Sequence, residues 1–465
     1  MNLNDVKNTL NLLIEELNFD DIFVYDAVNE KKYTYYDIFA KADFLGKNIL
    51  ESSNIVVMQN GIELLTIYFA ALFYGCQVIP VDPEKSVSEI ELIKSYHKEA
   101  KVLNETDIHF GTTDIVTDRK CVKELFANID YGVDYLITYT SGSSGNPKGV
   151  IHSAGNLLWS AINFGKRLGY SKKTCMCHVM PMTYMAGILN TIYLPFIMGG
   201  SIVLMERFGV KNANKFWKNV IKYQVNTLWL SPTMLHLIMI IDKGDEVKKY
   251  VGENSMTISV GTAPLSDALK AKFEEKYNVK VYQSYGLSET LFITTADQKL
   301  KHNVSVGRIL DDISLTFGED KEILIDLPWM FKGYVNENTE NYFEGKKYKT
   351  GDLGEWREDE LIISGRKKEL IIKGGINIYP KDIENCINEK FNLDEVCVGS
   401  KVIDEEERII CWYVGEEIEE KKLNDSVINK LGLHYKIDYF VKVEKIHKNL
   451  NGKVDKKKLV EEFRR

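Results

Sequence analysis

One short stretch of the chain, TSGSSGNPKG at residues 140–149, combines residue types that could bind a polyanion. Its glycines let the backbone turn N–H groups inward, its hydroxyl side chains add donors, and Lys148 supplies a positive charge. In a P-loop of the Walker type the lysine follows the second glycine and opens a helix, whereas here Lys148 precedes Gly149. The stretch therefore predicts a phosphate loop of another class, with a surface linker as the alternative.

Further motifs follow this loop at long intervals. They are SVGTAPLS at residues 259–266, QSYGLSET at 283–290, YKTGDLG at 348–354, SGRKKELIIKGGINIYPKDIE at 364–384 and NGKVDKKKL at 451–459. Together and in this order they resemble the signatures of the adenylate-forming (AMP-binding) superfamily. That superfamily contains acyl- and aryl-CoA synthetases, adenylation domains of peptide synthetases, and luciferases. The resemblance extends over essentially the whole chain.

The resemblance implies a site for ATP and its magnesium ion. Tyr285 would stack on adenine and Glu289 would bind the ion, since aromatic faces suit a purine and carboxylate oxygens suit a hard cation. Asp352 would accept hydrogen bonds from both ribose hydroxyls. The implied ATP- and AMP-binding residues are Thr140, Ser141, Gly142, Ser143, Ser144, Gly145, Lys148, Gly261, Thr262, Ala263, Tyr285, Gly286, Ser288, Asp352 and Arg366.

The resemblance also implies a movement between two reaction steps. Lys453 matches the catalytic lysine of the terminal motif, where a positioned ammonium stabilises the charge that develops as pyrophosphate leaves. Lys368 occupies the position of the domain hinge, and Gly374 and Gly375 fall in the loop that lines the pantetheine tunnel. The implied catalytic residues are Lys453, Glu289 and Tyr184.

The segment HVMPMTYMAGILN, residues 178–190, departs from the family pattern. Tyr184 replaces the usual histidine and keeps a ring and a donor, but it does not titrate near pH 7. The segment has no aspartate for an α-ammonium group, which argues against an α-amino acid substrate, and His178 is predicted to be structural. The predicted acyl pocket is Tyr184, Trp229, Ser284 and Leu287, with Met182, Met185 and Met234 as candidates that could equally be core.

Bulk properties exclude several classes of protein. A chain of 465 residues is too long for one compact core, so at least two domains are expected, and a net charge of −8 gives no bulk attraction to nucleic acid. The N-terminus reads as an amphipathic helix instead of a signal peptide, and proline and glycine interrupt the longest apolar stretch, residues 191–204. The seven scattered cysteines predict free thiols. We therefore expect a cytoplasmic protein without a membrane span.

The order of apolar runs predicts the fold class. Up to about residue 360, strand-like runs such as VNTLWLS alternate with helical patterns such as IELLTIYFAALFYG. This alternation predicts an α/β fold whose large N-terminal domain, residues 1–364, has mostly parallel sheets flanked by helices. Short strands and helices beyond that point predict a small, mobile α+β C-terminal domain, residues 365–465.

These inferences lead to a hypothesis of two half-reactions. A carboxylic acid would attack Mg-ATP to give acyl-AMP and pyrophosphate, and a phosphopantetheine thiol, with coenzyme A favoured, would then take the acyl group as a thioester. One alternative is a free-standing enzyme that loads an acyl or aryl acid onto a separate acyl carrier protein. Another is a non-catalytic nucleotide-binding relative, against which the intact set of site residues argues. The sequence does not identify the acid.

Overall fold

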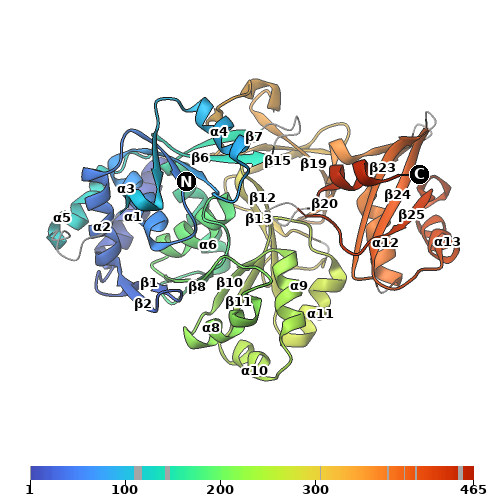
Figure 1. Cartoon of the computed structure of the whole chain (residues 1–465), viewed down its shortest axis with the longest axis horizontal. Helices are drawn as coiled ribbons and strands as arrows, with labels where there is room; N and C mark the ends of the chain where they lie inside the picture. Colours follow the sequence, from blue (N-terminus) through green and yellow to red (C-terminus); the bar gives the residue numbers. More distant parts are fainter. Residues whose placement is uncertain are drawn as a thin grey trace.

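The computed structural model describes residues 2–108, 118–141, 147–303, 305–373, 376–391, 393–403, 406–448 and 454–464. Figure 1 shows an elongated molecule. A large body contains the elements coloured blue to yellow, and the orange and red elements of the C-terminal part form a smaller body at one end.

A six-stranded sheet in the order β17-β7-β6-β4-β3-β5 carries the glycine loop. Its strands β3 to β6 are parallel, whereas β6 and β7 pair antiparallel and place Thr140 opposite Lys148. The residues that flank the loop are therefore fixed by strand pairing. The strands are β3 (Ser53–Val57), β4 (Gln77–Val81), β5 (Lys101–Asn104), β6 (Asp134–Ser141), β7 (Pro147–Ser153) and β17 (Gly333–Tyr334).

A nine-stranded sheet in the order β14-β13-β12-β11-β10-β8-β9-β1-β2 carries the SVGTAPLS and QSYGLSET motifs. Strands β12 through β1 in this order run parallel, and antiparallel pairs close both edges. The strands are β1 (Ile22–Asp26), β2 (Lys31–Thr34), β8 (Cys175–His178), β9 (Ser201–Leu204), β10 (Thr227–Leu230), β11 (Thr257–Val260), β12 (Val281–Leu287), β13 (Leu291–Thr295) and β14 (Arg308–Ile309).

A third sheet is entirely antiparallel. It consists of β15 (Ser314–Phe317), β16 (Glu322–Asp326), β18 (Phe343–Glu344), β19 (Lys347–Arg357) and β20 (Glu360–Arg366). Short turns join β15 to β16, β18 to β19 and β19 to β20, as antiparallel pairing permits, whereas β17 and the 3-10 helix Thr339–Tyr342 lie between β16 and β18. The predicted α/β class is confirmed: most strand pairs in the two large sheets are parallel, and this third sheet is antiparallel.

Helices cover the two large sheets of the N-terminal part (Figure 1). The predicted first helix, α1 (Leu3–Glu16), is capped by Asn2, whose side chain accepts from two backbone N–H groups. Helix α3 (Ile62–Tyr74) is apolar on every side and almost completely buried. The others are α2 (Tyr35–Asn48), α4 (Val87–Tyr96), α5 (Arg119–Leu125), α6 (Ala154–Leu168), α7 (Leu194–Ile197), α8 (Phe216–Lys222), α9 (Pro232–Ile241), α10 (Glu246–Glu253) and α11 (Asp267–Tyr277).

The C-terminal part has its own hydrophobic core. Strands β21 (Ile371–Lys373) and β22 (Ile376–Ile378) form an antiparallel pair, as the two strand-like runs of KELIIKGGINIY indicate, and β23 (Glu395–Ile403), β24 (Glu406–Val414) and β25 (Tyr439–Lys442) form a three-stranded sheet. Helices α12 (Pro380–Lys390), α13 (Glu420–Leu431) and α14 (Lys456–Glu462) pack with them. Within the described ranges, its buried clusters share no residue with those of the larger body. The boundary after residue 364 stays a prediction.

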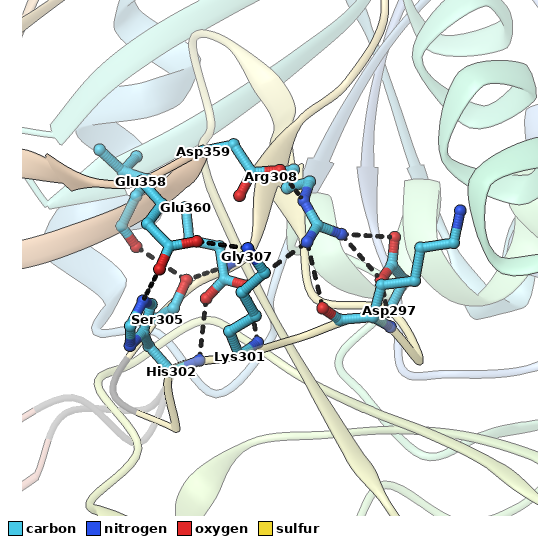
Figure 2. A network of polar contacts seen from close by, with 11 residues as sticks. Asp297, Lys301, His302, Ser305, Gly307, Arg308, Glu358, Asp359 and Glu360 are labelled. Carbon is cyan, nitrogen blue, oxygen red and sulfur yellow. Dashed lines mark hydrogen bonds and ion pairs between the residues drawn. The ribbon is translucent and has the colours of Figure 1, made fainter.

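A charged network anchors the turn between β19 and β20 (Figure 2). Arg308 forms ion pairs with Asp359 at 2.5 Å, Asp297 at 3.2 Å and Glu360 at 3.6 Å. The fully buried Glu360 carboxylate also accepts the backbone N–H of Lys301 at 2.7 Å. The turn end of this hairpin is therefore fixed to the loop before β14.

Two further expectations can be compared with the structure. All seven cysteines are free thiols, as predicted. In the part of the chain that the structure describes, no helix is both long enough and apolar enough to cross a membrane. The strand that contains Cys175 and Cys177 is an internal strand of the nine-stranded sheet, so neighbouring strands cover both of its edges.

Candidate active site

Lys148 lies on β7 and is only 8% exposed. Its ammonium is 2.8 Å from Glu337 Oε2 and donates a hydrogen bond to the Tyr342 hydroxyl. The ammonium also lies over the Tyr342 ring, 4.3 Å from the centroid. Burial lowers the pKa of Lys148, but the hydrogen bonds with Glu337 and Tyr342 outweigh this effect and raise the pKa above its ordinary value. The lysine is therefore a charged ammonium with a fixed position.

Residues 333–342, which we call the lysine clamp, hold the backbone on both sides of Lys148. Its first strand, β17, pairs with β7. The Asn336 carboxamide donates to the carbonyl of Pro147 at 2.9 Å and accepts from the N–H of Gly149 at 3.3 Å. One side chain thus bridges the two backbone neighbours of the lysine.

The predicted magnesium ligand, Glu289, lies just after β12. Its carboxylate accepts from the Tyr334 hydroxyl at 2.7 Å, and that hydroxyl is 3.0 Å from the hydroxyl of Tyr348. Burial and the nearby Glu289 raise the pKa of both tyrosines, so both stay neutral donors. Lys148 lies over the face of Tyr334, 5.4 Å from its centroid, so one tyrosine connects the lysine with the glutamate.

Asp352, the predicted ribose ligand, is 3% exposed on β19. Its two oxygens face different partners: Oδ1 is 2.9 Å from Nε of Arg366, and Oδ2 accepts from the Tyr285 hydroxyl at 2.8 Å. Strand pairing places Asp352 opposite Arg366. Asp352 raises the pKa of Arg366, and burial together with Asp352 raises the pKa of Tyr285 well above its ordinary value. The structure therefore brings three predicted nucleoside residues together.

The stretch of small residues after β11 has an unusual backbone. Thr262 has φ of 70°, which is uncommon for a β-branched residue and costs about 1–3 kcal/mol. Its buried Oγ1 has no hydrogen-bond partner among the described residues. A Cβ added at Gly261 would lie 3.1 Å from Cζ2 of Trp229 and 3.2 Å from Oγ of Ser284, so glycine lets these side chains approach the strand end.

Trp229, from the predicted acyl pocket, is 2% exposed and packs against Phe164 and Phe292. Its indole Nε1 is buried without a hydrogen-bond partner in the described ranges. Because Cζ2 and Nε1 are bonded to the same ring atom, the contact at Gly261 places the N–H edge of the indole near this glycine. Ser284 lies on the same side, whereas Leu287 packs with the cluster around Tyr334, near the lysine clamp.

The turn that carries Tyr184 is held from several directions. A Cβ at Gly187 would lie 1.9 Å from the carbonyl oxygen of Pro181, so only glycine closes this turn, and a π-helix (Ala186–Tyr193) follows. The Asn60 side chain donates to the carbonyl of Met180 at 2.7 Å and accepts from the N–H of Met182 at 2.7 Å. The tyrosine therefore sits on a tightly fixed turn.

His178 has the structural role that was predicted for it. Its Nδ1 is 2.7 Å from the Thr191 hydroxyl, which itself donates to the carbonyl of Gly187, so Nδ1 carries the proton. Its Nε2 faces the Asn60 amide at 3.4 Å. Burial lowers the pKa of His178 to about 3, so the ring is neutral. No charged imidazole is available at this turn.

The residue before the predicted hinge is tied to the larger body. Lys367 forms ion pairs with Asp320 at 2.6 Å and Glu322 at 2.8 Å. These hydrogen bonds raise the pKa of Lys367 well above its ordinary value. Glu322 is buried and also accepts the backbone N–H of Gly351, the neighbour of Asp352, the predicted ribose ligand.

The residue after the predicted hinge is tied to the smaller body. Glu369 is 2.7 Å from Lys456, at the start of α14, and Lys456 is 3.8 Å from Glu384 on α12. Lys368 lies between the two anchored residues, on the short 3-10 turn Lys367–Glu369. The predicted residues Gly142, Ser143, Ser144, Gly145, Gly374, Gly375 and Lys453 lie outside the described residues, as does the side chain of Ser141.

Comparison with known sequences decides the family. The family described as AMP-binding enzyme matches residues 16–335, more than two thirds of the chain. The chain belongs to this family. The family resemblance expected from the motifs is therefore confirmed.

Curated relatives of this AMP-binding enzyme include CoA ligases from several bacteria. A 2-succinylbenzoate–CoA ligase of Listeria monocytogenes is 30% identical over 334 residues, which cover 70% of this chain and 69% of the relative. One of Bacillus licheniformis is 26% identical over 440 residues, covering 87% and 88%. The relationship at 30% identity spans most of both chains.

Solved structures show the same fold. ATP-bound MatB from Rhodopseudomonas palustris superposes with a TM-score of 0.84 at 21% identity, covering 99% of both chains. The o-succinylbenzoate-CoA synthetase MenE from Bacillus subtilis, in complex with the acyl-adenylate OSB-AMP, superposes with a TM-score of 0.80 at 21% identity, covering 98% of both. The predicted large and small bodies thus follow a known architecture.

Family membership confirms the predicted enzyme class. The chain is an AMP-forming acid–thiol ligase: it activates a carboxylic acid as acyl-AMP with release of pyrophosphate, and a thiol then takes the acyl group as a thioester. Such a reaction uses magnesium-bound ATP, an acid and a thiol. The predicted co-substrates are therefore confirmed.

The described side chains fit a magnesium ion that arrives with ATP. The described part of the chain holds no group of three His, Cys, Asp or Glu that could hold a metal by itself. Mg²⁺ is often bound through one or two carboxylates together with substrate phosphates and water. Glu289 suits the part of that single carboxylate, because the Tyr334 hydroxyl donates to its Oε1 and holds the carboxylate in position.

Sequence reasoning missed the residues that hold the predicted ones. Asn336, Glu337 and Tyr342 were not singled out, although the GYVNENTENYF stretch that contains them follows a family pattern. Their signal is the presence of a carboxylate and an aromatic hydroxyl shortly after Tyr334, which suits an ammonium partner. Asn60 carries no comparable signal, because it acts through contacts with residues about 120 positions later.

Proposed function

We propose that this chain is an acid–coenzyme A ligase for an aromatic acid of the 2-succinylbenzoate type. The observation that carries the proposal is that relatives from Listeria, Oceanobacillus and Bacillus, all named 2-succinylbenzoate–CoA ligase, align over between 73% and 87% of this chain. The aromatic surroundings of Trp229 support an aromatic acid. The free thiols support a reducing compartment, and we place the enzyme in the cytoplasm.

In the first half-reaction the carboxylate of the acid attacks the α-phosphate of ATP, and the bond to pyrophosphate breaks. Lys148 attracts the β- and γ-phosphates, and Asp352 accepts from the ribose hydroxyls while Arg366 keeps it oriented. Glu289 holds the magnesium ion, which supplies positive charge to the phosphate oxygens. Lys453 stabilises the charge that develops at the α-phosphate. Position and electrostatics provide the catalysis, and no side chain becomes acylated.

In the second half-reaction the thiol attacks the acyl carbonyl, a C–S bond forms, and AMP leaves with the electrons of the C–O bond. The smaller body turns about Lys368, which removes Lys453 and brings Gly374 and Gly375 beside the thiol. Tyr184 borders the carboxylate, and the neutral His178 fixes the turn that carries it. The ion pairs on either side of Lys368 support a hinge at this residue.

ATP–pyrophosphate exchange across a panel of acids tests the proposal. The panel holds 2-succinylbenzoate, other benzoates, malonate, a fatty acid and α-amino acids. Exchange is expected with 2-succinylbenzoate or another aromatic acid, followed by a coenzyme A thioester detected by mass spectrometry. Exchange with none of the acids would overturn the function, and exchange with malonate alone would overturn the proposed substrate class.

A second candidate acceptor is a separate carrier protein. Gramicidin S synthase 2 aligns with 92% of this chain, and the aligned region is 10% of that enzyme. Bacitracin synthase 2 aligns with 94% of the chain over 18% of its own length. These alignments support the alternative in which the acyl group is loaded onto a carrier protein. A phosphopantetheinylated carrier that is acylated faster than coenzyme A at equal concentration would favour this candidate.

A further inference from the structure

We propose that Glu337 is a positioning residue of the phosphate site that holds the Lys148 ammonium in the free enzyme and gives it up when ATP binds. The carboxylate occupies, at 2.8 Å, the place beside the ammonium that a phosphate oxygen of the substrate would take. This inference rests on the proposed function, because it assigns the β- and γ-phosphates to Lys148. It adds a competitor for the lysine within the chain itself.

The pair is prepared by its surroundings. Tyr342 donates to the Glu337 carboxylate and accepts from the Lys148 ammonium, so one hydroxyl connects the two charges. Asn336, next to Glu337, bridges the backbone on both sides of the lysine. Burial raises the pKa of Glu337, but the hydrogen bond with Lys148 outweighs it and keeps the carboxyl ionised. Both partners are therefore charged and already within ion-pair distance.

Electrostatics favour an arrangement in which Lys148 exchanges Glu337 for phosphate over one in which both share the ammonium. A carboxylate and a triphosphate both carry negative charge, and side by side at one ammonium they would repel each other. Within the described ranges Lys148 has one ion-pair partner, Glu337, whose side chain is 25% exposed. The glutamate can therefore turn toward solvent when phosphate replaces it. Until then the pairing lowers the fraction of enzyme that is competent to bind a polyphosphate, and apparent affinity falls by that fraction.

This competition distinguishes ligands by their phosphates. ATP and pyrophosphate carry the groups assigned to Lys148, whereas AMP ends at the α-phosphate. Removing the Glu337 charge should therefore strengthen the binding of ATP and pyrophosphate without changing the binding of AMP. A residue that merely stabilised the fold would affect all three ligands together.

Isothermal titration calorimetry with Mg-ATP, Mg-pyrophosphate and AMP tests the inference on the full chain. Glu337→Gln is expected to bind Mg-ATP and Mg-pyrophosphate about three- to thirtyfold more tightly than the unchanged chain, with AMP affinity unaltered. Glu340→Gln is the matched control: it removes the same charge from the same clamp, but Glu340 is exposed and forms no ion pair among the described residues. It should leave all three affinities unaltered.

A second variant protects the test against a folding defect. Tyr342→Phe keeps the ring under Lys148 and the direct ion pair but removes the connecting hydroxyl, so a smaller gain for ATP and pyrophosphate is expected. Unchanged or weaker ATP binding in Glu337→Gln would overturn the inference, as would an equal gain for AMP. If the unchanged chain bound none of the three ligands, the proposed function itself would fall, and this inference with it.

Discussion

The predicted nucleotide end and acyl end of the site differ in whether their buried polar atoms already have partners in the protein. At the nucleotide end each charged side chain already has a charged or hydroxyl partner: Asp352 has Arg366, Lys148 has Glu337, and Glu289 has Tyr334. Partners of this kind keep charges fixed before a ligand arrives. ATP binding would therefore exchange the partner of Lys148, whereas Asp352 and Glu289 would keep Arg366 and Tyr334 as partners.

At the predicted acyl end a buried donor is left over. Trp229 Nε1 has no hydrogen-bond partner within the described ranges, and neither has the buried Oγ1 of Thr262, a predicted nucleotide residue whose neighbour Gly261 lies against the indole. An unsatisfied buried donor costs about 1–3 kcal/mol, so a substrate that satisfies it recovers this free energy. The difference leads to the expectation that the acid is recognised through an unused donor, whereas ATP is recognised through donors and acceptors that are already in use.

The largest effect is expected from removing the charge of Glu289. Glu289→Gln should lower ATP–pyrophosphate exchange about 100- to 1,000-fold, because the amide is a poor ligand for magnesium at a site of electrostatic stabilisation. Its oxygen can still accept from Tyr334, so the melting temperature should stay close to that of the unchanged chain. Exchange measured over a range of magnesium concentrations checks this. An unchanged rate of ATP–pyrophosphate exchange would mean that another residue holds the ion, and the assignment of Glu289 as metal ligand would be wrong.

The next effect concerns the ribose partner. Asp352→Asn should lower kcat/KM for ATP about 100-fold, because a charge-assisted acceptor is lost and Arg366 loses its ionic partner. The sharper readout compares ATP with 2′-deoxy-ATP. The unchanged chain should discriminate between them, and the variant should discriminate much less. Equal discrimination by both would place the ribose away from Asp352.

Each end also contains one buried, neutral histidine. Burial lowers the pKa of His152, whose Nε2 donates to the carbonyl of Ser288 beside Glu289, to about 4, and that of His178 to about 3. The unfolded chain takes up these protons first, near pH 6.5, so stability is complete above that pH and falls as the pH drops toward the folded-state values. From pH 7.5 to 5.5 each histidine should lower the free energy of unfolding by about 1.4 kcal/mol.

Urea unfolding at the two pH values measures this loss. Replacing either histidine by asparagine should remove its share of the pH dependence, and the double replacement should remove both. An unchanged pH dependence in both single variants would show that the histidines are not the groups responsible.

The smallest effect is expected at the acyl end. Trp229→Phe keeps an aromatic ring but removes the unused N–H, so kcat/KM should fall about fivefold for an acid that carries an additional acceptor and stay unchanged for one without. Trp159→Phe is the matched control, because its Nε1 is equally without a partner in the described ranges, its ring packs with Trp329, and it is not one of the predicted acyl-pocket residues. An equal loss for both kinds of acid would remove the contrast between the two ends.

The nucleotide end was more predictable from the sequence than the acyl end. Tyr285, Asp352 and Arg366 stand in motifs that combine glycines with several polar residues, and the antiparallel register then brings two of them face to face. Glu337 was not predictable as the partner of Lys148. The two residues are 189 positions apart in the sequence (337 minus 148), and the pairing of β17 with β7 brings them together. The unused donor of Trp229 is a property of packing, and no local pattern indicates it.

The fold was predictable to a similar extent. Apolar runs separated by helices indicated the parallel strands, and the KELIIKGGINIY pattern indicated a hairpin that the structure contains. The antiparallel sheet between β15 and β20 was not predicted, because its strands are partly exposed and their alternation is irregular. The network around Arg308 likewise depends on buried Glu360, whose burial follows from tertiary packing alone.

The anchors on either side of Lys368 have a mechanical consequence. Lys367 is fastened to the larger body and Glu369 to the smaller one, so a rotation of the smaller body has to be taken up in the few backbone torsions between them. Such a short pivot permits the smaller body to rotate while the residues that anchor it to the larger body stay in place. Since Arg366 lies on the supported side and remains paired with Asp352, the enzyme could turn its smaller body without loosening its grip on the reactive acyl-AMP.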